Sequence, residues 1–133
     1  MKRPASSSLF LRYGPAAFMT AFVPVLSLLP ARFFRPVESH LPPVPALDKA
    51  VHAILYAALT AAWLHAAPHA RRASLATALG TAFAATAFGL LMEAGQGALT
   101  ATRTMDPLDA LANAAGAFSS ALIFAAAARR RTP

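Results

Sequence analysis

The chain of 133 residues contains no cysteine and only five acidic residues. The lack of cysteine excludes disulfide bonds and thiolate metal sites within this sequence. Charged residues make up 13% of the chain and hydrophobic residues 57%, which leaves thin polar cover for the surface of a soluble domain. Because lipid covers the outside of a membrane domain, the composition predicts a domain embedded in a membrane.

Four apolar segments are each close to the length of about 20 residues that a helix needs to cross a bilayer. We expect membrane spans at approximately 13–31, 49–67, 74–94 and 107–128. Together they predict an all-α protein, an integral membrane four-helix bundle that forms a single domain over 1–133. The alternative for the first segment is a signal peptide, but its end, "SLLPAR", lacks the small-residue cleavage pattern, so we expect an uncleaved span.

Basic residues are distributed unequally over the two sides of the predicted spans. One side carries no acidic residue and eight basic ones, which are Lys2, Arg3, Arg12, Arg71, Arg72, Arg129, Arg130 and Arg131. The other side carries all five acidic residues, so the positive-inside rule predicts that both termini are cytoplasmic. A basic face beside anionic headgroups accounts for the isoelectric point near 11.4, and we therefore predict no nucleic-acid partner.

Polar residues at the outer ends of the second and third spans follow helical spacing. In "DKAVHAILY", Asp48, His52 and Tyr56 are spaced i, i+4, i+8, which places them along one face of a helix. In "EAGQ", Glu93 and Gln96 are spaced i, i+3 and share a face.

The segment "RTMDPLDALANAAG" at the start of the fourth span holds the third polar stripe. Its residues Asp106, Asp109, Asn113 and Gly116 again fall on one helical face. Asp106 before Pro107 is typical of an N-cap followed by proline at the first helical position. Topology and spacing together predict one polar site near the outer surface.

The three motifs, in this order, resemble the VanZ-like family of small membrane proteins. The family pattern is D-K-x-x-H-x-x-x-Y, then E-x-x-Q, then R-x-x-D-x-x-D-x-x-x-N-x-x-G. The matching residues, between 48 and 116, are Asp48, Lys49, His52, Tyr56, Glu93, Gln96, Arg103, Asp106, Asp109, Asn113 and Gly116. The resemblance implies a membrane protein that acts at the cell envelope, since the name-giving member is associated with low-level resistance to the glycopeptide teicoplanin. It implies no particular reaction.

Ionisable groups at membrane depth are costly and are functional candidates by default. We predict catalytic roles for His52, Asp109 and Glu93, with His52 or Asp109 as a general base. The predicted ligand-binding residues are Asp48, Lys49, Tyr56, Gln96, Arg103, Asp106 and Asn113. Arg103 and Lys49 are suited to hold a phosphate or carboxylate.

Other interpretations of the same residues stay open. Arg103 with Asp106 or Asp109, and Lys49 with Asp48 or Glu93, could form ion pairs that only tie helix ends together. We predict no cofactor and no metal site, because no tight ligand motif such as H-E-x-x-H occurs; a divalent cation on two carboxylates and a histidine is the minority alternative. Gly116 is interpreted as a close-packing position.

The predicted function is binding of an anionic lipid headgroup or another envelope ligand, with a link to glycopeptide resistance. The alternatives are an enzyme that modifies a lipid-linked substrate and an accessory protein whose ion pairs form a structural latch. The expected partners are membrane lipids and a lipid-linked or glycopeptide ligand, and a homo-oligomer is left open. We expect a multi-pass protein of the cytoplasmic (inner) membrane whose polar site faces the outside or the periplasm.

Overall fold

The computed structural model describes residues 5–29, 47–67, 74–99 and 105–130, and side chains from residue 9 onward. The described residues form four α-helices: α1 (Ala5–Leu28), α3 (Leu47–Ala66), α4 (Leu75–Leu99) and α5 (Pro107–Arg129). The protein is therefore an all-α helical bundle, as the sequence predicts. The predicted spans lie within a few residues of α3, α4 and α5, whereas α1 begins well before the predicted start at Tyr13.

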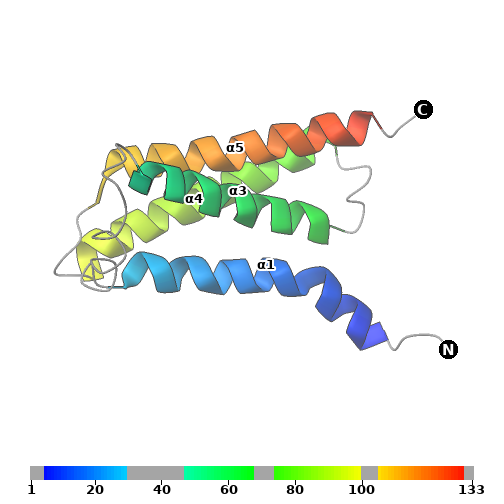
Figure 1. Ribbon diagram of the computed structural model, residues 1–133, viewed down its shortest axis with the longest axis horizontal. Coiled ribbons are helices and arrows are strands. Elements are labelled where there is room, and N and C mark those ends of the chain that lie inside the picture. The colour runs from blue at the N-terminus through cyan, green and yellow to red at the C-terminus, as the bar shows by residue number, and fades with distance from the viewer. Residues whose placement is uncertain (1–4, 30–46, 68–73, 100–104, 131–133) are drawn as a thin grey trace.

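The four helices run alternately up and down along the long axis of the molecule (Figure 1). α5 packs along both α3 and α4, and α1 lies against α3 and α4 without contacting α5 within the described residues. This arrangement brings the starts of α3 and α5 to the same end of the bundle as the ends of α1 and α4 (Figure 1). We call this the polar end, because the three sequence motifs lie there.

Three of the described helices are long and apolar enough to cross a membrane. They are the segments Leu9–Leu28, Leu75–Leu99 and Pro107–Arg129. α3 has 20 residues, a length of about 30 Å, and it carries the ionisable side chains of Asp48, Lys49 and His52 near its start. With these three helices the chain is a multi-pass membrane protein, and α3 is not among the described helices that are apolar enough to cross.

Small residues allow α3, α4 and α5 to approach closely. The core they share contains Ala78, Ala82, Ala117 and Ala121, all fully buried. The closest approach is at Gly116 in α5, where a β-carbon would overlap the carbonyl oxygen of Ala53 in α3. Gly116 is therefore a close-packing position, and the packing places the first turns of α3 and α5 side by side.

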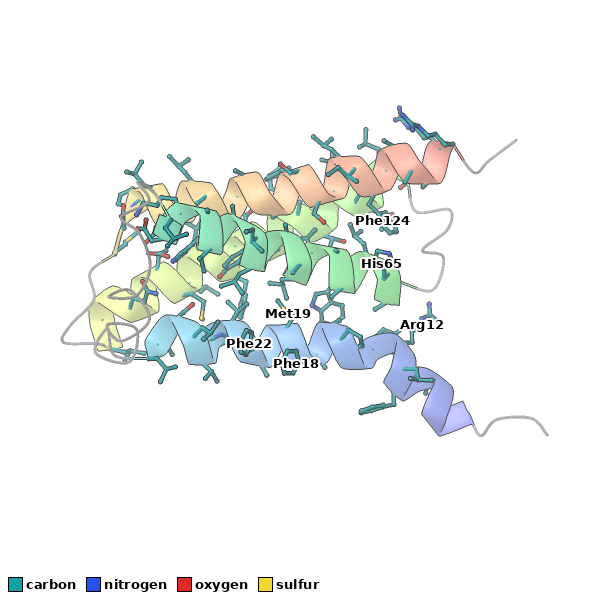
Figure 2. All side chains as sticks on the ribbon, viewed as in Figure 1. Arg12, Phe18, Met19, Phe22, His65 and Phe124 are labelled. Atoms are coloured by element: carbon teal, nitrogen blue, oxygen red, sulfur yellow. The ribbon has the colours of Figure 1, made fainter. Side chains whose placement is uncertain are left out.

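α1 is bent near its first third, where Pro15 interrupts the helical hydrogen bonds, and Arg12 lies at this bend (Figures 1 and 2). The Arg12 Nε donates a hydrogen bond of 2.7 Å to the carbonyl oxygen of Ala66, which is one of the last carbonyls of α3. A second link is the hydrogen bond of 3.0 Å from Trp63 Nε1 to Thr20 Oγ1. These two bonds hold α1 against α3 on the side away from α5.

Candidate functional site

Six side chains from three helices form a compact group at the polar end, and we call this group the polar cluster. Its members are Lys49, His52, Glu93, Asp106, Asp109 and Asn113. α3 supplies Lys49 and His52, α4 supplies Glu93, and the other three lie at the start of α5. The structure thus brings together residues that are up to 64 positions apart, as between Lys49 and Asn113.

Lys49 is the centre of an ion-pair network that links α3 to the start of α5. Its Nζ lies 2.7 Å from Asp48 Oδ2, 2.6 Å from Asp106 Oδ2 and 2.7 Å from Asp109 Oδ1. Because its ammonium hydrogen-bonds to both Asp106 and Asp48, it holds the pKa values of these two carboxyls below their usual range. Three carboxylates therefore share one cation.

Asp106 has a structural role in addition to its ion pair. It is the N-cap of α5, and its Oδ1 accepts a hydrogen bond of 2.8 Å from the backbone N–H of Leu108. Pro107 follows at the first position of the helix, where its missing N–H costs nothing. The backbone N–H of Asp106 donates at 3.3 Å to Glu93 Oε2, which ties the end of α4 to the start of α5.

His52 lies between the carboxylates of the two neighbouring helices. Its Nδ1 is 3.2 Å from Asn113 Oδ1 and 3.7 Å from Glu93 Oε1. Its Nε2 is 3.8 Å from Asp109 Oδ2 on the opposite side of the ring. The imidazole is thus oriented by Asn113 and faces two acidic groups, an arrangement suited to proton transfer or to cation binding.

Glu93 is the most deeply buried ionisable group of the cluster, with its side chain only 1% exposed. Among the described residues it accepts a long hydrogen bond from the Asp106 N–H, and its nearest basic side chain is His52, at 3.7 Å. Burying a carboxylate with so little compensation is costly. A proton, a cation or a hydrogen-bond donor next to Glu93 would therefore stabilise the site.

Tyr56 lies one turn further into the bundle than His52. Its side chain is buried, and its hydroxyl has no hydrogen-bond partner among the described residues. A β-carbon at Gly89 of α4 would lie 3.0 Å from the Tyr56 ring and 3.1 Å from Asn113 Nδ2. Gly89 therefore makes room for these two side chains, a role that the sequence analysis missed although Gly89 is one turn before Glu93.

The sequence also predicts ligand binding by Gln96 and Arg103. Gln96 is buried and donates a hydrogen bond of 2.9 Å from Nε2 to the carbonyl oxygen of Ser27, so the structure places it against α1. Arg103 lies outside the described residues, and its predicted pairing with Asp106 or Asp109 stays a prediction. The predicted partner of Lys49 in α4, Glu93, is replaced by Asp106 and Asp109 of α5, while the predicted pair with Asp48 is present.

At the polar end, acidic side chains outnumber basic ones among the residues that the structure describes. Four of the five acidic residues of the chain, Asp48, Glu93, Asp106 and Asp109, gather around a single lysine. Three of these carboxylates lie within 2.7 Å of the Lys49 ammonium, and the fourth, Glu93, lies beside His52. The described residues attract positive charge and hydrogen-bond donors more strongly than they attract an anion.

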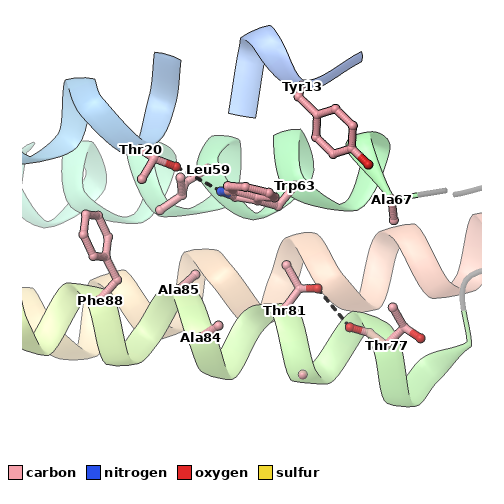
Figure 3. A pocket seen from close by; sticks show the side chains of 11 residues that line it. Tyr13, Thr20, Leu59, Trp63, Ala67, Thr77, Thr81, Ala84, Ala85 and Phe88 are labelled. Atoms are coloured by element: carbon pink, nitrogen blue, oxygen red, sulfur yellow. Dashed lines mark hydrogen bonds between the residues drawn. The ribbon is translucent and has the colours of Figure 1, made fainter. Parts of the chain in front are cut away.

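Two shallow apolar grooves lie on the bundle away from the polar cluster. One is bordered by Tyr13 and Thr20 of α1, Trp63 of α3, and Thr81 and Phe88 of α4 (Figure 3). The other lies between α3 and α5, with Ile54, His65 and Phe124 along it. Both are lined mainly by carbon atoms, so they are suited to contact the hydrocarbon interior of a bilayer.

Comparison of the chain with protein-family models, with curated proteins and with solved structures finds no match. The VanZ-like resemblance therefore rests on the three motifs alone.

Proposed function

We propose that the chain is a VanZ-like membrane protein of the cell envelope that binds the polar headgroup of a phosphate-bearing lipid at its polar end. The observation that carries the proposal is the gathering of four carboxylates, one lysine and one histidine at one end of an otherwise apolar bundle. Ionisable groups are rare at membrane depth and mark binding or transport sites when they occur. The ends of the helices are also where lipid headgroups are found.

The charge balance of the cluster narrows the class of headgroup. Arg103 of the third motif is the residue suited to hold the phosphate, because the ammonium group of Lys49 is already shared by three carboxylates. The surplus carboxylates and Asn113 favour hydrogen-bond donors such as an ammonium group or sugar hydroxyls. We therefore infer a headgroup that carries both a phosphate and several donors, in place of the purely anionic ligand expected from the sequence.

Binding alone is sufficient for a role in glycopeptide resistance. A protein that holds an envelope lipid or its precursor at the membrane surface would change the access of a drug to that lipid. This link to resistance derives from the VanZ-like resemblance and is part of the proposal.

Native mass spectrometry of the detergent-extracted protein tests the proposal. Wild type should retain a discrete phospholipid or lipid-linked species, and Arg103→Gln should lose it. Arg130→Gln is the matched control, because it removes the same charge at the other end of the bundle, where Arg130 is exposed. Bare protein in all three samples would contradict lipid binding and favour the structural latch.

The second candidate is an enzyme that modifies the same headgroup. The observation in its favour is the orientation of His52, which Asn113 holds at 3.2 Å while Asp109 lies near the other ring nitrogen. A histidine oriented in this way can act as a general base. In that case Asp109→Asn should abolish turnover and keep the bound lipid, and unchanged turnover would exclude this role for Asp109.

A further inference from the structure

The polar cluster contains a smaller group of three potential metal ligands that no local sequence motif reveals. One nitrogen of His52 and one oxygen each of Glu93 and Asp109 lie within 4.8 Å of one another. The three residues come from α3, α4 and α5, so their sequence spacing resembles no metal-binding motif. We propose that His52, Glu93 and Asp109 bind a divalent metal ion, with Mn²⁺ or Zn²⁺ as the best match.

The distances between the three side chains suit a metal ion. Glu93 Oε1 and Asp109 Oδ2 lie 3.7 Å and 3.8 Å from the nearest nitrogens of His52. These are too long for direct hydrogen bonds. An ion that binds its ligands at about 2.1 Å holds neighbouring ligand atoms about 3 to 3.5 Å apart. These two carboxylate oxygens face different nitrogens of His52, but one potential ligand atom from each side chain lies within 4.8 Å of the others. The imidazole therefore has to turn one nitrogen toward both carboxylates to close the site around the ion.

Each ligand is held by a partner that leaves one atom for the ion. Asp109 Oδ1 contacts Lys49 at 2.7 Å, while its Oδ2 faces His52. Glu93 Oε2 accepts from the Asp106 N–H, while its Oε1 faces His52. Supporting contacts of this kind orient metal ligands and are as characteristic of a metal site as the ligands themselves.

The burial of Glu93 provides an independent argument for a cation. Its side chain is 99% removed from solvent, and the hydrogen bond that its Oε2 accepts from the Asp106 N–H is long, at 3.3 Å. His52 and Asp109 are 18% and 15% exposed, so they form the entrance of a site whose bottom is Glu93. A divalent ion offsets the charge of the two carboxylates, and within the described part of the chain Glu93 forms no ion pair with a lysine or an arginine.

The chemistry of the ligands selects the class of metal. Ca²⁺ and Mg²⁺ prefer sites built from oxygen ligands alone. An imidazole with two carboxylates suits borderline ions, and the remaining coordination positions would be open to water or to a phosphate oxygen. The proposal rests on the three side chains and does not depend on lipid binding.

Titration of the EDTA-treated, detergent-purified protein with Mn²⁺, followed by the electron paramagnetic resonance signal of the free ion, tests the site. Wild type should bind one Mn²⁺ per chain, and Zn²⁺ should displace it. Asp109→Asn and the isosteric Glu93→Gln should weaken binding at least about 10-fold. Asp48→Asn is the matched control, because it removes an equal charge from a partner of Lys49 that is 62% exposed and contributes no ligand.

Equal weakening by Asp48→Asn and Asp109→Asn would show that only the general negative charge attracts the ion, and would overturn the site. If a variant fails to fold, the melting temperature of wild type with and without Mn²⁺ decides, because an ion bound only to the folded state raises it. No saturable binding and no rise in melting temperature would also overturn the proposal. Since no lipid is added, this failure is distinct from failure to retain a lipid.

Discussion

Substitution of Gly116 by alanine should destabilise the bundle and loosen the polar cluster at the same time. The added β-carbon would overlap the carbonyl oxygen of Ala53 and lie 2.7 Å from its carbonyl carbon. Favourable contacts between carbon atoms begin at about 3.5 Å. Because the atoms in the way belong to the α3 backbone, no side-chain rotation relieves the overlap, and α3 and α5 must separate by about 1 Å.

The magnitude follows from two contributions. Overpacking of a close contact costs about 1–3 kcal/mol. Ala53 is next to His52, and Gly116 is one turn after Asn113, so the separation also weakens the contact of 3.2 Å between His52 and Asn113. Loss of a hydrogen bond adds about 1 kcal/mol. We expect Gly116→Ala to lower the free energy of unfolding by about 2–4 kcal/mol.

Unfolding in mixed detergent micelles with increasing sodium dodecyl sulfate, followed by circular dichroism, measures this free energy. Gly80→Ala in α4 is the matched control, because a β-carbon there meets no atom within 4 Å. Alanine is the better helix former by up to about 1 kcal/mol, so this control should be neutral or slightly stabilising. Equal stability of the two variants would refute the close approach of α3 and α5.

Three further outcomes follow from the described contacts. The lowered pKa of Asp106 means that its stabilising ion pair with Lys49 is present above about pH 4 and is lost as pH falls through the folded-state pKa. Melting temperatures should therefore drop in that acid range, and an unchanged melting temperature there would contradict a stabilising role for the ion pair. Arg12→Met removes the bond to Ala66 and should cost about 1–3 kcal/mol in the same unfolding assay, whereas no change would show that α1 is held otherwise. Tyr56→Phe removes a buried hydroxyl without a described partner and should be neutral or stabilising; a loss above about 1 kcal/mol would reveal a partner.

The helices and the place of the site could be predicted from the sequence. Hydrophobic length and charge placement predict the spans, because the bilayer imposes both. Helical spacing predicts which residues share a face, and Asp106 before Pro107 predicts the start of α5, since capping depends on neighbouring residues alone. The convergence of the motifs at one end follows from an up-and-down order of helices.

The contacts inside the site could not be predicted in the same way. Lys49 pairs with Asp106 and Asp109 and not with Glu93. This pairing depends on the relative position of α3 and α5 along their axes, which the close approach of Gly116 to Ala53 determines. Gln96 shares a face with Glu93, but α4 lies between α1 and α5. Gln96 follows Glu93 by three residues, and this shift along the helix is enough to direct its side chain toward α1, whereas Glu93 faces the polar cluster.

The pairing of α3 with α5 has a consequence for biogenesis. α3 carries Lys49 and His52 near its start, and the groups that compensate them belong mostly to α5, which leaves the ribosome last of the four described helices. A nascent α3 entering lipid alone would carry these polar side chains without most of their partners, which is costly. We therefore expect the stable placement of α3 in the membrane to depend on its pairing with α5, the last of the four described helices.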